Sequence, residues 1–232
     1  MDVRGLLGLL LIDGSLVPYR SPTGGYIQLT LTAGVSESSF LEDKVAEFRQ
    51  FVATKAEIIP YSTKPRANGK FTQFLRFRVS TNKLRPVYNL LYPQGERRIT
   101  APALELLGAR AAAWCWAEGG RLLKDGTSVL ARVGGTTDEA CLMASWLEVL
   151  TGASSELEGE LVKPRLSFNA EQTTKLQQAL LSYAPPSRLH LFTGELWDVS
   201  TIRSARTELL LGEGQHLTEG QQEAPLAGAQ AQ

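Results

Sequence analysis

Leu6-Leu7-Gly8-Leu9-Leu10-Leu11-Ile12-Asp13-Gly14 is the part of this 232-residue chain from which its architecture can be worked out. The run is apolar and helix-favouring from about Val3, and Gly14 ends it as helix C-termini often end. It is shorter than the roughly twenty apolar residues of a membrane span. Asp13 interrupts it before a signal-peptide cleavage pattern can follow. We therefore interpret it as a helix whose C-terminal end carries one carboxylate.

A second stretch of this kind is Ala111-Ala112-Ala113-Trp114-Cys115-Trp116-Ala117-Glu118-Gly119. It also ends in an acid followed by glycine, and Glu118 comes 105 residues after Asp13. One such match could arise by chance, because Leu-rich helices that end in Asp-Gly are not rare. Two matches separated by half the chain instead indicate an internal repeat.

Hydrophobic periodicity predicts the order helix, two strands, helix, two strands, helix in each half. In the first half the predicted elements are 3–13, 15–20, 26–32, 36–52, 54–63, 71–80 and 84–92. In the second half they are 101–118, 121–123, 128–133, 138–150, 155–161, 165–168 and 170–183. We therefore expect an α+β fold of two pseudo-symmetric αββαββα lobes, residues 1–96 and 97–204. Residues 205–232, rich in Gly, Gln, Glu and Ala, are expected to be a disordered tail.

The charge of the chain is zero overall but unevenly distributed. Residues 53–98 hold ten Lys or Arg and two Glu, whereas residues 136–160 hold six acids and no base. In the strand 71–80, Arg76 and Arg78 alternate with apolar residues, as Gln28 does in the strand 26–32. Such a polar sheet face can donate hydrogen bonds to base edges and phosphates, although it is also compatible with an ordinary solvated face.

The two cysteines, Cys115 and Cys141, provide neither a zinc site nor a disulfide framework. A reduced, intracellular setting is the simplest interpretation. His190 and His216 have no partner pattern that would indicate a histidine–metal nuclease.

The two stretches resemble the paired motifs of single-chain LAGLIDADG homing endonucleases. In the first copy, Leu6, Gly8, Leu9 and the closing Asp13-Gly14 match the nine-residue motif. The second copy in double-motif members is often an aromatic-rich helix that ends in an acid and Gly, after Leu-Thr-x-x-x-Leu. Here Ile99-Thr100-Ala101-Pro102-Ala103-Leu104 begins such a passage. The resemblance covers about residues 3–196.

This resemblance implies that the motif helices pack side by side and that Asp13 and Glu118 meet at their tips. Two close carboxylates repel one another unless a cation lies between them, and Mg²⁺ is the cofactor that the family implies. Each acid would serve one DNA strand. The family pattern also places a Lys before the second motif helix and another after the last helix, where this chain has Arg97-Arg98 and Arg188. Because Arg does not readily give up a proton, we expect Arg98 and Arg188 to stabilise charge.

The resemblance further implies a saddle of sheets over double-stranded DNA, bound by a monomer. The expected DNA contacts in the first lobe are Arg20, Gln28, Lys55, Lys64, Arg66, Lys70, Arg76 and Arg78. Those in the second lobe are Arg121, Lys124, Arg132, Lys163 and Arg165. Three alternatives stay open: a non-cleaving relative that binds nucleic acid, such as an intron-splicing maturase or a regulator; a nickase that acts only through Asp13; and a scaffold without a nucleic-acid role.

Overall fold

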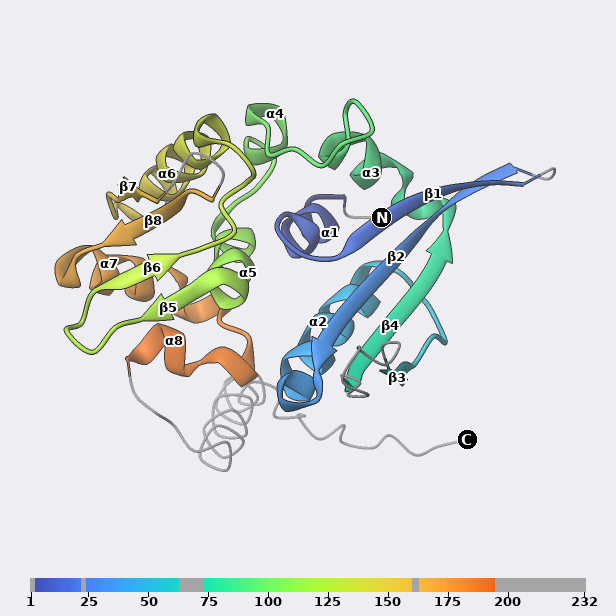
Figure 1. Cartoon of the computed structure of the whole chain (residues 1–232), viewed down its shortest axis with the longest axis horizontal. Helices are drawn as coiled ribbons and strands as arrows, with labels where there is room; N and C mark the ends of the chain where they lie inside the picture. The colour runs from blue at the N-terminus through green and yellow to red at the C-terminus, as the bar shows by residue number, and fades with distance from the viewer. Residues whose placement is uncertain (1–2, 22–23, 63–72, 160–162, 195–232) are drawn as a thin grey trace, which may run out of the picture. The chain divides into compact units, whose positions relative to one another are not determined.

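The computed structural model describes residues 3–21, 24–62, 73–159 and 163–194. Within these ranges the chain forms an α+β fold with two antiparallel four-stranded sheets and eight α-helices (Figure 1). The expected fold class is thus confirmed, and both halves show the predicted alternation of helices and strand pairs.

The first sheet has the strand order β1-β2-β4-β3. Its strands are β1 (Ser15–Ser21), β2 (Gly24–Gly34), β3 (Ile58–Ser62) and β4 (Gln73–Thr81). The helices of this half are α1 (Val3–Leu10), α2 (Ser38–Phe51) and α3 (Arg85–Leu91). α2 packs on β2 and β4, so helices cover one face of the sheet.

The second sheet repeats this order as β5-β6-β8-β7. Its strands are β5 (Gly120–Leu122), β6 (Ser128–Leu130), β7 (Glu156–Glu158) and β8 (Arg165–Phe168). The helices are α4 (Ala101–Leu104), α5 (Ala109–Gly119), α6 (Thr137–Thr151), α7 (Ala170–Leu180) and α8 (His190–Thr193). α6 and α7 both pack on β8. Identical strand order in two sheets is the structural counterpart of the sequence repeat.

Several predicted helices have different bounds in the structure. α1 ends at Leu10 instead of Asp13. The predicted helix 101–118 is interrupted between α4 and α5, because Gly108 adopts an extended conformation. The Gly108 carbonyl accepts hydrogen bonds from the backbone N–H groups of Ala111 and Ala112, so a new helix starts there.

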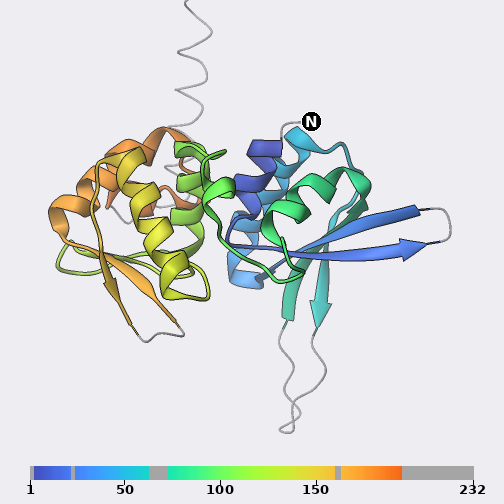
Figure 2. The same ribbon diagram turned by 90° about the horizontal axis from the view of Figure 1, so that it is seen from above.

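α1 and α5, which carry the two motifs, pack against each other (Figure 2). Gly8 is buried at this contact, and a Cβ atom there would lie 2.6 Å from the Cβ of Ala111. Ala112 and Ala113 are fully buried on α5. Small residues on both helices therefore allow a close approach of the two backbones, which brings the motif ends together.

Each sheet buries one face and exposes the other. Leu29, Leu31 and Phe77 of the first sheet are buried, as are Leu166 and Phe168 of the second. Strand residues of the opposite parity form the exposed faces, as period-two alternation requires. None of the helices in the described ranges is long and apolar enough to cross a membrane.

Candidate active site

Asp13 follows α1 on a turn that only a glycine allows. Gly14 has φ +78°, and a Cβ atom there would lie 2.9 Å from Cδ2 of Leu31. The Arg97 guanidinium donates hydrogen bonds to the backbone carbonyls of Leu10, Gly14 and, at 2.9 Å, Asp13. Because the last carbonyls of a helix lack intrahelical partners and carry its negative dipole end, Arg97 fixes the position of the turn.

Glu118 lies in the last turn of α5, and its position is also fixed by close packing. The following Gly119 is buried, and a Cβ atom there would collide with the carbonyl oxygen of Ala131 after β6. The indole N–H of Trp116 donates to the carbonyl of Leu191 at 3.1 Å, which ties α5 to α8. The end of α5 is thus held from two sides.

The structure brings the carboxylates of Asp13 and Glu118 together on one ammonium group. Lys44 of α2 lies 2.5 Å from Oδ2 of Asp13 and also forms an ion pair with Oε2 of Glu118. The Lys44 side chain is only 6% exposed, against 20% for Asp13 and 12% for Glu118. Two acids far apart in the sequence therefore share one largely buried counter-charge.

Arg132 approaches the same carboxylates from the solvent side. Its Nη1 donates to Oε1 of Glu118 and lies 3.8 Å from Oδ1 of Asp13, and its side chain is 55% exposed. Arg132 is also the only non-glycine residue of the described ranges with positive φ, 60°. A strained backbone at such a position is typical of functional sites. Lys44 and Arg132 together offset the charge of the two acids.

These contacts determine the ionisation of Asp13. Burial alone would raise its pKa, but the charge and hydrogen bond of Lys44, the backbone N–H of Gly14 and the charge of Arg132 outweigh burial and hold the pKa below its ordinary value. Asp13 is therefore an anion at neutral pH, as a ligand for a cation must be.

Lys44 was missed by the sequence analysis. A signal for it existed, because Lys44 lies on the buried stripe of α2 with Phe40, Leu41, Val45 and Phe48. A charged residue on such a stripe needs a buried partner. The partners come from α1 and α5, so no pattern within α2 identifies them.

Arg98 and Arg188 each form an ion pair with an acid other than Asp13 and Glu118, and Arg188 lines one hollow together with Glu118. Arg98 is exposed and pairs with Glu96 at 3.0 Å, whereas its neighbour Arg97 contacts the end of α1. Arg188 pairs with Glu37 and stacks on the ring of Phe40, with 4.4 Å between Cζ and the ring centroid. Among the described residues, the side chains of Lys44 and Arg132 contact the two carboxylates, and Arg188 shares the Phe40 ring with Lys44.

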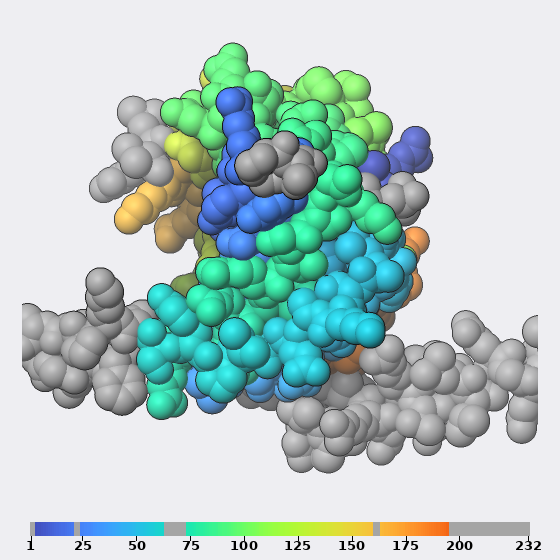
Figure 3. Space-filling model, turned by 90° about the vertical axis from the view of Figure 1, so that its right-hand side faces the viewer, coloured from blue at the N-terminus to red at the C-terminus, as the bar shows by residue number. Residues whose placement is uncertain are grey.

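The exposed face of the first sheet carries several of the expected DNA contacts. Arg78 lies opposite Thr30, and Arg76 lies opposite Thr32. Gln28 shares this face and donates to Oγ of Ser80 at 3.2 Å. β3, beside these arginines, is exposed along most of its length (Figure 3). The first sheet therefore offers hydrogen-bond donors on a solvent-exposed face.

Two other expected contacts of the first half, Arg20 and Lys55, lie elsewhere. Arg20 is exposed, but it shares strand parity with the buried Leu16, so it leaves β1 on the core-facing side. Lys55 is exposed between α2 and β3. Lys64, Arg66 and Lys70 lie outside the described residues.

In the second half, Arg121 and Arg165 lie on the exposed face of the sheet. Lys124 is exposed in the turn between β5 and β6, and Lys163 is exposed just before β8. Arg132, also expected as a DNA contact, lies at the carboxylate pair.

The carboxylate oxygens at the pair fit a divalent cation that takes its other ligands from a substrate. The oxygens of Asp13 and Glu118 already lie around one positive charge, that of Lys44. Within the described ranges no group of three or more His, Cys, Asp or Glu could hold a metal. Mg²⁺ commonly uses one or two carboxylates and takes its remaining oxygens from water and substrate phosphates. The pair therefore suits such an ion better than a closed structural metal site.

Comparison with known proteins identifies the fold. The family model described as LAGLIDADG DNA endonuclease family matches residues 4–176. The homing endonuclease I-WcaI, solved bound to its DNA recognition sequence, has a TM-score of 0.63 and 14% identity over 80% of this chain and 84% of that chain. I-DmoI, solved in complex with DNA and Mn, has a TM-score of 0.52 and 15% identity over 78% and 96%. A sequence search of curated proteins gives no significant match.

Proposed function

This chain belongs to the LAGLIDADG DNA endonuclease family, and we propose that it makes a double-strand break in a long, pseudo-palindromic DNA site in a Mg²⁺-dependent reaction. The observation that carries this proposal is the convergence of Asp13 and Glu118 on Lys44. A carboxylate from each half at one position is the arrangement needed to serve both strands of a duplex.

In this proposal Asp13 and Glu118 would hold the metal. Mg²⁺ bound there would activate a water and stabilise the leaving oxygen of the scissile phosphate. Lys44 holds the two carboxylates together from the protein side. Arg132, half-exposed, exchanges its contact with Glu118 for a phosphate oxygen and so offsets the charge that develops during the reaction. Lys44 and Arg132 thereby have the charge-stabilising role that is also expected of Arg98 and Arg188.

The exposed sheet faces would bind the flanking duplex as a monomer, since one chain provides both acids. Arg76, Arg78 and Gln28 support binding by the first sheet, and Arg121 and Arg165 by the second. If several phosphates are contacted, the affinity will fall steeply with salt concentration.

Selection from a randomised duplex library, followed by assays on a supercoiled plasmid that carries the selected site, tests the proposal. We expect the parent protein with Mg²⁺ to give linear plasmid. Asp13→Asn and Glu118→Gln should each lose linear product, while Glu105→Gln, which changes an exposed acid elsewhere, should behave like the parent. If both active-site variants linearise the plasmid at the parent rate, the site assignment is wrong.

A second candidate function, nicking of one strand through Asp13, is favoured by the unequal surroundings of the two acids. Both oxygens of Glu118 contact a cation, Lys44 on Oε2 and Arg132 on Oε1, whereas Oδ1 of Asp13 lies 3.8 Å from Arg132. A nickase would give open-circular plasmid as its final product. A non-cleaving nucleic-acid binder would shift the selected duplex on a gel and leave it intact with Mg²⁺.

A further inference from the structure

The exposed faces of the two sheets differ in charge. On the first sheet, the outward-facing residues within the described ranges include Arg76 and Arg78 and no acid. On the second sheet, outward-facing arginines and glutamates are equal in number: Arg121, Arg165, Glu156 and Glu158. Glutamates on a surface that approaches DNA oppose binding through phosphate repulsion, so their presence there needs an explanation.

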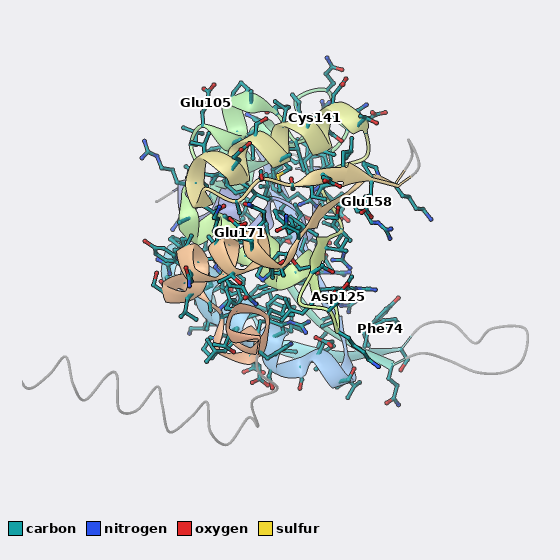
Figure 4. The ribbon with its side chains drawn as sticks, turned by 90° about the vertical axis from the view of Figure 1, so that its left-hand side faces the viewer. Phe74, Glu105, Asp125, Cys141, Glu158 and Glu171 are labelled. Carbon is teal, nitrogen blue, oxygen red and sulfur yellow. The ribbon has the colours of Figure 1, made fainter. Side chains whose placement is uncertain are left out.

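Glu158 forms a cross-strand pair with Arg165. The two residues are register partners on β7 and β8, and Oε2 of Glu158 accepts from Nε of Arg165 at 3.2 Å and lies 3.0 Å from its Nη2. The side chains are 42% and 53% exposed and line a hollow of about 600 Å³. Figure 4 shows Glu158 on the strand side of this half and Glu171 on the helix α7. The pair thus faces outward and lines this hollow.

The Arg165–Glu158 pair presents donors and an acceptor side by side. Both contacts use Nε and Nη2 of Arg165, so Nη1 faces no acceptor among the described residues. Hydrogen bonds from Ser167 and Arg165 lower the pKa of Glu158, which keeps its carboxylate an acceptor. A donor beside an acceptor is the pattern of a residue pair that reads one base pair.

In the major groove, a G·C pair presents the acceptors N7 and O6 of guanine beside the N4 amino donor of cytosine. Arginine is the side chain that most often donates to N7 and O6 of guanine, and the Glu carboxylate accepts a hydrogen bond from N4 of cytosine. Resting on the proposed endonuclease function, we propose that Arg165 and Glu158 act as one unit that reads a G·C base pair in the half-site bound by the second sheet. Glu158 costs general affinity and contributes selectivity.

The variant Glu158→Gln distinguishes base-pair reading by Glu158 from the role of an ordinary surface ion pair. The variant should bind unrelated duplex more tightly than the parent, because one carboxylate is removed. It should also lose the preference for G·C at one position of the second half-site, a preference of about 5- to 150-fold. Glu171→Gln is the matched control, since Glu171 forms an exposed ion pair with Lys175 at 2.8 Å on α7. The control should leave the selected sequence unchanged.

A second measurement uses the parent protein and altered DNA. Replacing the cytosine of that base pair by its analogue without the 4-amino group should weaken binding by the parent and have little effect on Glu158→Gln. The proposal is overturned if Glu158→Gln selects the parent sequence, or if parent and variant respond equally to the analogue. Absence of any sequence-selective DNA binding by the parent would instead reject the proposed function itself.

Discussion

Lys44→Met removes the buried positive charge that both motif acids contact and replaces it with an apolar side chain of similar length. Asp13 and Glu118, whose side chains are only 20% and 12% exposed in the parent, then face each other without this charge. Removing one partner of a buried ion pair costs about 3–5 kcal/mol. Arg132 offsets little of this, because its side chain is 55% exposed and exposed charges are screened. At about 2–4 °C per kcal/mol for a unit of this size, the Tm should fall by roughly 6–20 °C.

The pH dependence of the two proteins should run in opposite directions. In the parent, the pKa of Asp13 is lowered on folding, so its stabilising contribution is present above the unfolded pKa and is lost as the pH falls through the folded one. In Lys44→Met, mutual repulsion raises the folded pKa of the pair. The destabilisation is then small below the unfolded pKa, about 4, and grows as the pH rises through the raised value. The stability gap should therefore widen from acidic to neutral pH.

Thermal and urea unfolding at pH 4.5 and 7.5 measure both effects. Lys175→Met is the matched control, because Lys175 pairs with Glu171 on the surface of α7, where such i,i+4 pairs contribute about 0.3–0.5 kcal/mol. Millimolar Ca²⁺ should raise the Tm of Lys44→Met more than that of the parent, since an ion that binds only the folded state stabilises it. The reasoning is refuted if Lys44→Met loses no more stability than Lys175→Met, or loses equal amounts at both pH values.

Three shorter predictions follow. Arg97→Met should lower the free energy of unfolding by about 1–3 kcal/mol, because carbonyls at the end of α1 lose their donor, and denaturant titration measures this. Gly8→Val should cost at least about 1–3 kcal/mol, because even a Cβ atom there lies 2.6 Å from Ala111; a Tm equal to that of the parent would contradict the close helix contact. Iodoacetamide at pH 8 should modify the exposed Cys141 and spare Cys115 in the native protein, as mass spectrometry would show, because burial raises the pKa of the Cys115 thiol to about 12.

The fold could be predicted from the sequence to a large extent because its signals are local and occur twice. Alternating apolar residues fixed which face of β2 and β4 is buried. The break before α5 was missed because one hydrophobic periodicity runs through residues 101–118, although Gly108, a residue type that weakens helices, lies within them. The direction of Arg20 was missed for a simpler reason: a one-residue difference in parity reverses the face on which a side chain lies.

Of the residues at the site, only the two acids could be predicted. Asp13 and Glu118 close the two motif stretches, and the family resemblance implies that they meet. Lys44 and Arg132 lie on a helix and a loop whose own patterns do not point to the pair. Arg97 and Arg98 are neighbours with the same chemistry, and the course of the backbone decides which one contacts α1.

The duplicated fold contains a site that is not duplicated, and the reason is geometric. Lys44 is the seventh residue of α2, and the seventh residue of the equivalent helix α6 is the fully buried Met143. Because both carboxylates converge on one point, one buried ammonium contacts both, and a second from α6 would compete for the same oxygens. The remaining counter-charge, Arg132, therefore comes from a loop on the exposed side. In the proposed reaction a phosphate would reach the acids from that side, so we expect DNA to displace Arg132 and leave Lys44 in place.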